Sequence, residues 1–334
     1  MRPWLTVFAI ALAAALPAAA AAQSLDTILP SLTNADPFTL SVDPTYPTPG
    51  SSVTITALSS NIDLTSATMT VFAGGKSIYQ GNVRSVAVPT GAAGVQTTVK
   101  VVITVGGTDY AKTISIRPED VSLVVEPRAT VPPLYPGKAV PPLDGNVRIV
   151  AVAGFRAGGT AFDPASLSYV WTVDGARQTD ASGIGKSTIV VATPMQYRTR
   201  AVSVVISTPD GTIASGASIS LSPQEPTVRL YESDPLLGIR FDHALGSSYT
   251  IAGAEQTLYA APFSFPTMNG LPSLVWYLDG NQAQTGPVIT LRPNGSGQGS
   301  ASLSFVAADT SFARATQSLS LTFGTQPSTS FFGL

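Results

Sequence analysis

The sequence has 334 residues, of which 44% are hydrophobic and only 11% are charged, with no cysteine and one histidine. The charged share is less than half of the roughly 25% usual in globular proteins, and the abundance of Ser, Thr, Gly and Pro instead favours many short β-strands joined by turns. The net charge of −2 comes without a basic cluster, which excludes nucleic acid as a partner, and the lack of cysteine excludes disulfides and thiol chemistry.

The N-terminus has the pattern of a secretory signal peptide. Arg2 precedes an apolar run from Trp4 to Leu16, and small residues follow at 18–22. We expect a signal peptide at residues 1–22, cleaved before Gln23, and a linker at residues 23–36. A retained membrane anchor is the alternative, although the run is shorter than the ~20 residues that a bilayer requires. The mature chain is expected to have no membrane span.

An internal repeat is the strongest signal in the sequence. Residues 168–175 read SYVWTVDG and residues 273–280 read SLVWYLDG, so that Trp171 matches Trp276 and Asp174 matches Asp279. Alternating apolar residues place each tryptophan on one face of a strand, and the Asp-Gly pair after it predicts a tight hairpin turn.

A weaker copy of the pattern occurs at residues 67–81, ATMTVFAGGKSIYQG, where Val71 replaces the tryptophan. Each copy then continues into two long alternating strands. About seven short strands per hundred residues with one central tryptophan predict an all-β protein of three tandem immunoglobulin-like β-sandwich domains. We place them at residues 37–118, 119–224 and 225–323, with Trp171, Trp276 and Val71 in their cores, and a flexible C-terminal tail at residues 324–334.

The pattern Y-x-W-x-x-D-G at residues 169–175 resembles the central strand of bacterial Ig-like and PKD-like repeats of surface proteins. The sequence departs from PKD repeats in lacking their fuller Gly-Asp-Gly signature, and from antibody domains in lacking both cysteines. The resemblance implies the sandwich fold and an extracellular scaffold or adhesive role.

The stretch Gly185-Lys186-Ser187 looks like the end of a nucleotide-binding P-loop. However, Asp180 stands where the first glycine of that motif belongs, and the β-branched run at residues 188–191 predicts a strand where the motif needs a helix. We therefore expect no nucleotide binding.

Candidates for catalysis and metal binding are few. His243 lies near Asp242, Ser247 and Ser248, but no G-x-S-x-G motif surrounds either serine, so we interpret it as an exposed loop histidine. With one histidine and no cysteine, the common zinc, copper and haem sites are excluded. We predict no catalytic residue, metal site or cofactor.

Calcium is the remaining possibility among metals. Three turn aspartates of the second repeat could converge at one end, namely Asp163, Asp174 and Asp210. Aspartate is also an ordinary turn residue, and this interpretation is preferred.

The proline-rich segment at residues 126–145 has two interpretations. It could be a polyproline ligand of a recognition module, or an extended crossover between two strands in which proline blunts an exposed sheet edge. A similar stretch, DPTYPTPG, at residues 43–50 favours the structural interpretation.

Two apolar segments are candidates for partner binding. Phe263, Phe265 and Met268 lie in a predicted end loop, where they are either buried plugs or an exposed contact patch. Phe331, Phe332 and Leu334 lie in the predicted tail, which either folds back on its domain or contacts a partner.

These features favour an exported, non-enzymatic protein that is a structural spacer or adhesive module. Its expected location is extracellular, on the cell surface, or in the periplasm if the cell has an outer membrane, and its expected partner is an envelope or surface protein. The alternative is a carbohydrate-binding or glycan-hydrolysing protein, which would need exposed aromatic rings or a pair of carboxylates in a cleft.

Overall fold

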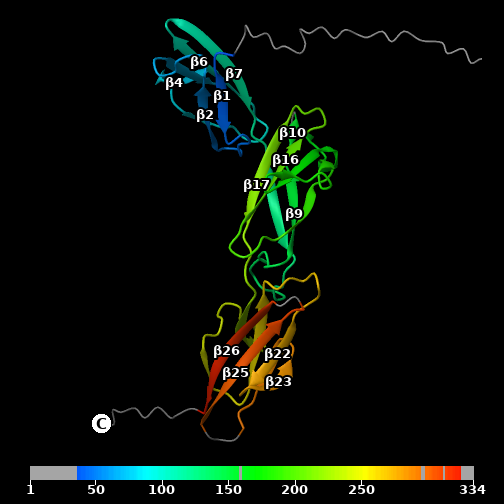
Figure 1. Cartoon of the computed structure of the whole chain (residues 1–334). Helices are drawn as coiled ribbons and strands as arrows, with labels where there is room; N and C mark the ends of the chain where they lie inside the picture. Colours follow the sequence, from blue (N-terminus) through cyan, green and yellow to red (C-terminus); the bar gives the residue numbers. More distant parts are fainter. Residues whose placement is uncertain (1–35, 158–159, 295–297, 311–312, 325–334) are drawn as a thin grey trace, which may run out of the picture.

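The computed structural model describes residues 36–157, 160–294, 298–310 and 313–324, which form three β-sandwiches arranged end to end (Figure 1). The predicted signal peptide, almost all of the linker after it, and Phe331, Phe332 and Leu334 lie outside the described residues. Among the residues that are described, no helix is long and apolar enough to cross a membrane.

The first sandwich pairs a three-stranded sheet with a four-stranded sheet. The three-stranded sheet has the order β1-β2-β5, and the four-stranded sheet has the order β4-β3-β6-β7. The strands are β1 (Thr39–Asp43), β2 (Ser52–Leu58), β3 (Thr68–Ala73), β4 (Lys76–Asn82), β5 (Val86–Pro89), β6 (Thr97–Val105) and β7 (Thr108–Ile116).

The second sandwich repeats this plan, with sheets β15-β9-β8 and β13-β12-β16-β17. Its main strands are β8 (Val121–Pro127), β9 (Asn146–Ala153), β12 (Ser168–Val173), β13 (Ala176–Arg177), β15 (Thr188–Ala192), β16 (Arg200–Ser207) and β17 (Ala214–Leu221). The short elements are β10 (Arg156–Ala157), β11 (Thr160–Ala161), a 3₁₀ helix at Pro164–Ser166, and β14 (Gly183–Ile184), which pairs with β12.

The third sandwich has the same plan with one added strand in each sheet, giving the orders β19-β18-β21-β24 and β20-β26-β25-β22-β23. Its strands are β18 (Thr227–Asp234), β19 (Gly238–Ile239), β20 (Ser248–Ile251), β21 (Gln256–Phe263), β22 (Ser273–Leu278), β23 (Asn281–Thr285), β24 (Val288–Leu291), β25 (Gly299–Ala308) and β26 (Arg314–Phe323).

Three separate hydrophobic cores follow from the alternation of apolar residues along these strands, because successive side chains point to opposite faces of a sheet. The cores draw their buried residues from positions 38–116, 121–221 and 228–321. The chain is therefore an all-β protein of three tandem immunoglobulin-like sandwiches, each with its own core.

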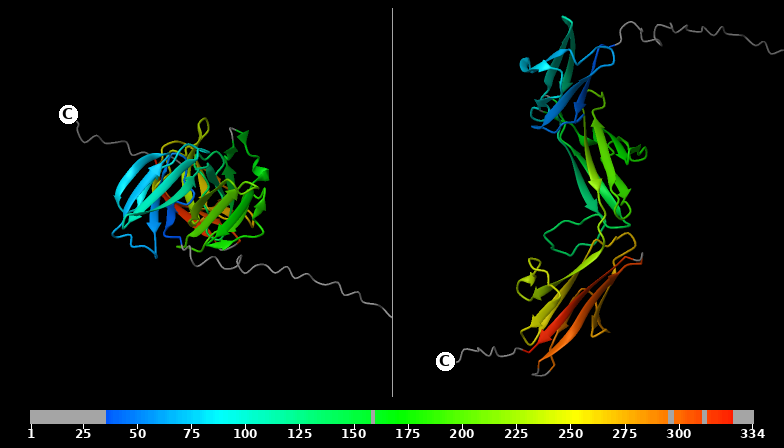
Figure 2. Two further views of the ribbon diagram at one scale, coloured as in Figure 1. Left: turned by 90° about the horizontal axis from the view of Figure 1, so that it is seen from above. Right: turned by 60° about the vertical axis from the view of Figure 1, so that its left-hand side comes forward.

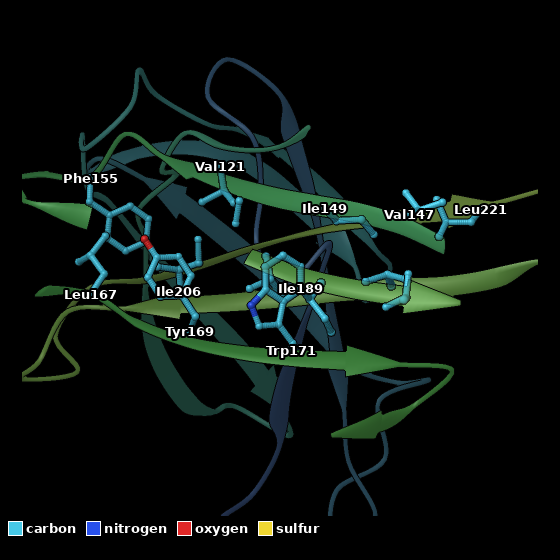
Figure 3. Packing of buried hydrophobic residues seen from close by; sticks show 14 of the residues in the cluster. Val121, Val147, Ile149, Phe155, Leu167, Tyr169, Trp171, Ile189, Ile206 and Leu221 are labelled. Carbon is cyan, nitrogen blue, oxygen red and sulfur yellow. The ribbon is translucent and has the colours of Figure 1, made fainter. Parts of the chain in front are cut away.

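Equivalent residues occupy the centre of each core. Trp171 on β12, Trp276 on β22 and Val71 on β3 are all fully buried (Figure 3 shows Trp171). The indole N–H of Trp171 donates to the Lys186 carbonyl and that of Trp276 donates to the Gly286 carbonyl, both at 2.9 Å. Each tryptophan thus satisfies its polar atom at the loop that enters β15 or β24.

The turn after each of these strands is a two-residue hairpin with both residues in the left-handed region. The φ angles are 49° and 82° at Asp174-Gly175, and 49° and 80° at Asp279-Gly280. Each aspartate also accepts a hydrogen bond from a backbone N–H of the neighbouring strand, at 2.9 Å from Ala201 and 2.8 Å from Ser302. The Asp-Gly pair therefore both permits the turn and fastens it to the sheet.

Candidate functional site

The junction between the second and third sandwiches is built by the proline-rich segment. We call residues 128–145, which connect β8 to β9, the strap. The crossover interpretation is correct in that this segment joins the first two strands of its sandwich. The interpretation did not say which surface the strap contacts, and its outgoing limb lies against the third sandwich (Figure 1), while Pro132 and Pro142 are buried.

The outgoing limb of the strap pairs with the loop before β22. Thr130 N–H donates to the Phe265 carbonyl at 2.8 Å, and Ser264 N–H donates to the Thr130 carbonyl at 3.1 Å. The Thr130 hydroxyl accepts from Phe265 N–H at 3.0 Å, and Thr267 N–H donates to the Arg128 carbonyl at 3.1 Å. Thr130, Ser264 and Phe265 are buried, so these bonds are shielded from water and hold two chain segments that are distant in sequence.

The returning limb binds the linker between the sandwiches. Leu143 N–H donates to the Gln224 carbonyl at 3.0 Å, and Gln224 N–H donates to the Pro141 carbonyl at 2.8 Å. Gly145 then enters β9 at a point of close approach, where an added Cβ would lie 2.4 Å from Pro142 and 3.4 Å from Pro266. A side chain at this position would force the strap away from the third sandwich.

The tip of the strap carries Tyr135, which completes an aromatic cluster on the third sandwich. Its ring lies 4.9 Å from that of Phe263 and 5.4 Å from that of Phe241, both in edge-to-face geometry. Phe241 in turn contacts Tyr231 and Tyr259 at ring distances of 5.2 and 6.3 Å. Because Tyr231 and Tyr259 alternate with core residues along β18 and β21, this cluster lies on the outer face of the four-stranded sheet and forms a second, smaller core.

The predicted end loop therefore serves mainly as an internal joint. Phe265 is completely buried in the third core and hydrogen-bonded to the strap, and Phe263 is half-buried against Tyr135. Phe263 is the last residue of β21 and not a loop residue as predicted, and of the three predicted binding residues Met268 is the one with an exposed side chain, at 53%. Tyr135 was not predicted, and its only signal in the sequence was an aromatic residue within an unusually long proline-rich connection.

Exposed apolar side chains gather on the loops that meet at this junction. Leu134 lies on the strap, Met195 and Tyr197 lie on the loop between β15 and β16, and Met268 and Leu271 lie on the loop between β21 and β22. All five are exposed, Leu134 at 96% and Tyr197 at 93%. The loops are linked by hydrogen bonds from Thr193 to Gly145 and from Thr267 to Arg128. Apolar loop residues of this kind mark a surface suited to protein contact.

The junction between the first and second sandwiches contains a buried acid, Glu119. Arg117 Nε lies 2.7 Å from Glu119 Oε1, and the Arg117 guanidinium also donates to the Arg156 carbonyl. The Glu119 side chain is fully buried, and within the described residues its Oε2 has no hydrogen-bond partner. Burial raises the pKa of Glu119, and the neighbouring Arg117 opposes that shift.

The stretch that resembles a P-loop has a structural role. Lys186 lies in the turn before β15, where its ammonium donates to the Asp180 carbonyl at 2.6 Å and its own carbonyl accepts from Trp171. The strand Thr188–Ala192 follows it, whereas a P-loop leads into a helix whose N-terminus faces the phosphates.

The remaining polar candidates do not converge. His243 is exposed, and the Asp242 carboxylate is bound by Arg240 at 3.1 Å. Asp174 lies at the end of β12 where Val173 pairs with Val202, whereas Asp163 and Asp210 lie toward the opposite end. In the described part of the chain no three His, Cys, Asp or Glu side chains are grouped so as to hold a metal ion.

No family model and no curated protein matches the chain. Solved structures of tandem domains are similar to it. Three N-terminal domains of the outer capsid protein Hoc of bacteriophage RB49 match at 14% identity and a TM-score of 0.25, covering 86% of this chain and 99% of that one. The central fibronectin-III array of RIM-binding protein matches at 9% identity and a TM-score of 0.30, covering 87% and 98%, and the I67–I69 fragment of titin matches at 12% identity and a TM-score of 0.22, covering 86% and 98%. Within the described residues, the chain is a tandem array of immunoglobulin-like sandwiches.

Proposed function

We propose that this chain is an exported, non-enzymatic protein of the bacterial cell surface, in which domains at residues 37–118, 119–224 and 225–323 form a spacer that presents protein-binding loops. The observation that carries this proposal is the strap, which joins the second and third sandwiches through a built contact instead of a flexible linker. A spacer needs such joints, because its end-to-end length is defined only if successive domains keep a fixed orientation and distance relative to each other.

The form of the molecule supports a spacer. The sandwiches succeed one another along one axis, with the first and third at opposite ends of the column (Figure 2). Both junctions use more than the connecting peptide, since Tyr46 of the first sandwich lies over Gly216 of β17 while the strap covers part of the third sandwich. Each net hydrogen bond of the strap contributes about 0.5–1.5 kcal/mol, so several of them acting together resist bending at the junction.

Protein binding is supported by the loops and not by the core aromatics. Trp171 and Trp276 are buried and cannot stack on a sugar ring, which removes the residues that a carbohydrate-binding module would use first. The exposed apolar side chains at the second junction suit contact with a protein of the envelope or cell surface. The predicted tail residues Phe331, Phe332 and Leu334 are a second proposed contact for the same class of partner.

Export is supported by the sequence of residues 1–22. The test is to express the full chain with a C-terminal epitope in a bacterial host and to determine the N-terminus of the product. We expect it to begin at Gln23, and the epitope to be accessible to protease on intact cells or after the outer membrane is opened. A matched variant, Ala11→Arg, should remain inside the cell, because a charge interrupts the apolar run. Full-length protein that keeps Met1 and stays in the cytoplasm would overturn the proposal.

A further inference from the structure

The third sandwich shows how the side between its two sheets is closed. Strand β20 pairs in parallel with the end of β26, with Tyr249 opposite Leu321 and Ile251 opposite Phe323. Ile251 is buried and Tyr249 is half-buried, while Ser248 and Thr250 between them are exposed. The hydroxyl of Tyr249 bonds to Glu232 of β18 in the opposite sheet, and burial together with this bond raises the pKa of Tyr249. A four-residue strand with alternating polar and apolar residues thus covers the open side.

The same position is vacant in the second sandwich. The pairings of the two tryptophan strands make Ala217 of β17 equivalent to Gln317 of β26, so Leu221 is equivalent to Leu321. The segment that returns to the second strand, which corresponds to β20, is here the returning limb of the strap. It forms a parallel bridge from Pro142 to Gln224, beyond the end of β17. Among the described residues, no strand pairs with the outer edge of β17.

A groove takes the place of the missing strand. It has a volume of about 610 Å³ and lies between Leu123 and Val125 of β8 and Ile219 and Leu221 of β17. Leu123, Val125 and Ile219 are residues of the core face that remain only partly buried, because no strand in the described part of the chain covers this side.

The groove is continuous with both junctions. A second hollow of about 510 Å³ shares Leu123 and Ile219 with it and extends to Pro44 and Tyr46 of the first sandwich. At the other end the lining includes Lys138 of the strap, which is its one charged residue. Its walls are therefore apolar, with one free backbone edge and one cation at the end where β17 finishes.

We propose that this groove binds an extended segment of a partner protein as an additional strand, parallel to β17. The segment has large apolar residues at alternate positions, as β20 does, and an acidic residue near its C-terminal end that faces Lys138. Backbone pairing with the edge of β17 supplies affinity, and the alternating side chains between the sheets supply specificity. This inference deepens the proposed binding role, and it rests on that role.

The test uses a fluorescein-labelled peptide, GSYTISVD, whose Tyr, Ile and Val alternate with small polar residues. Binding to the mature chain is measured by fluorescence anisotropy, and the site is mapped by amide chemical shifts. We expect the shifts to concentrate on β8 and β17, and the peptide GSTSYIVD, with the same composition but no alternation, to bind at least tenfold more weakly. Shifts confined to β26, or no saturable binding, would overturn the proposal.

Two pairs of variants sharpen the result. Ile219→Glu should abolish binding, while Ser122→Glu, on the exposed face of β8, should leave it unchanged. Lys138→Glu should weaken GSYTISVD about two- to fivefold and strengthen GSYTISVK by a similar factor, as expected for an exposed ion pair. Lys100→Glu in the first sandwich is the control for overall charge. Lys138 is exposed and lies outside the core, so the Lys138→Glu variant remains informative if Ile219→Glu fails to fold. If both peptides bind equally well to Lys138→Glu and to the unmodified chain, the predicted orientation of the bound segment is refuted.

If the peptide does not bind, the spacer proposal still stands, because that proposal is tested separately by export and cell-surface exposure. If the protein stays in the cytoplasm but binds the peptide at β17, the proposed location is overturned and the proposal that the groove binds an extended segment is supported. The two outcomes are therefore distinguishable.

Discussion

Replacement of Tyr135 by alanine should loosen the second junction without unfolding either sandwich. The ring of Tyr135 makes two edge-to-face contacts with the third sandwich, to Phe263 and Phe241, but lies outside the three main cores. The remaining members of the outer cluster keep their own contacts, since Phe241 still meets Tyr231 and Tyr259. The effect should therefore fall on docking of the strap and not on folding.

The magnitude follows from those two contacts. An edge-to-face aromatic pair contributes about 0.5–1.5 kcal/mol beyond the area that it buries, so the pair of contacts contributes about 1–3 kcal/mol. Since about 1.4 kcal/mol changes an equilibrium constant tenfold, the ratio of undocked to docked strap should rise between about fivefold and a hundredfold. The backbone bonds at Thr130 remain and should prevent complete release.

Bending at the second junction can be measured as the distance between two spin labels, because the chain has no native cysteine. Two exposed residues, Ala176 in the second sandwich and Gln284 in the third, can be changed to cysteine and spin-labelled without background labelling. We expect a narrow distance distribution between the labels in the parent chain. In the Tyr135→Ala variant the distribution should broaden, while the melting transitions of the sandwiches stay within a few degrees of the parent.

The matched control is Tyr197→Ala, which removes an aromatic ring that is 93% exposed near the same junction. It should leave the distance distribution unchanged. A distribution that stays equally narrow in Tyr135→Ala would refute the role of the strap as a joint. A distribution that is already broad in the parent chain would refute the spacer as a whole.

Three further predictions test the cores and turns. Trp276→Ala should destabilise the third sandwich by about 3–5 kcal/mol in urea unfolding, and Trp276→Phe should cost less because most of the packing is kept; equal losses would contradict this account of the site. Asp279→Ala should cost about 1–3 kcal/mol, because it removes the bond to Ser302 and replaces an aspartate, which tolerates the left-handed region, with an alanine at a φ of 49°. Asp279→Gly should recover part of the loss, because glycine adopts this φ freely and Gly74 occupies the equivalent turn position; no difference between the two variants would exclude strain at this turn. The raised pKa of Glu119 means that its folded form takes up a proton more readily than its unfolded form, so its contribution to stability is greatest at low pH and is lost as the pH rises above 4.5 through the folded pKa. Glu119→Gln should therefore flatten the dependence of melting temperature on pH in that range, and an unchanged slope would show that the acid is solvated.

The fold could be predicted from the sequence because its signals are local. Alternation of apolar residues specifies which face of a strand is buried, and an Asp-Gly or Gly-Gly pair permits the left-handed φ angles of a tight hairpin. These short-range rules placed Trp171, Trp276 and Val71 at equivalent points, although the three sandwiches share few other residues.

The path of the proline-rich segment could not be predicted in the same way. Proline indicates an extended backbone, but it does not say on which surface that backbone will lie. The bond between Thr130 and Phe265 joins residues 135 positions apart, and it forms only because the end loop of the third sandwich presents unpaired backbone groups at that point. For the same reason the sequence left open whether Phe263 and Phe265 are buried plugs or a contact patch, whereas in the structure Phe265 is fully buried and Phe263 packs against Tyr135.

The strands, their buried faces and the tight turns follow from the sequence alone, since each depends on neighbours within a few residues. The way in which the sandwiches meet, and the side of each that is left open, depend on contacts between distant parts of the chain. The outgoing limb and the tip of the strap bind the third sandwich, and its returning limb only borders the side of the second sandwich between β8 and β17, so within the described residues that side has no closing strand. The position of the strap depends on which of two distant surfaces binds it more strongly, and a local pattern of residues does not contain that information.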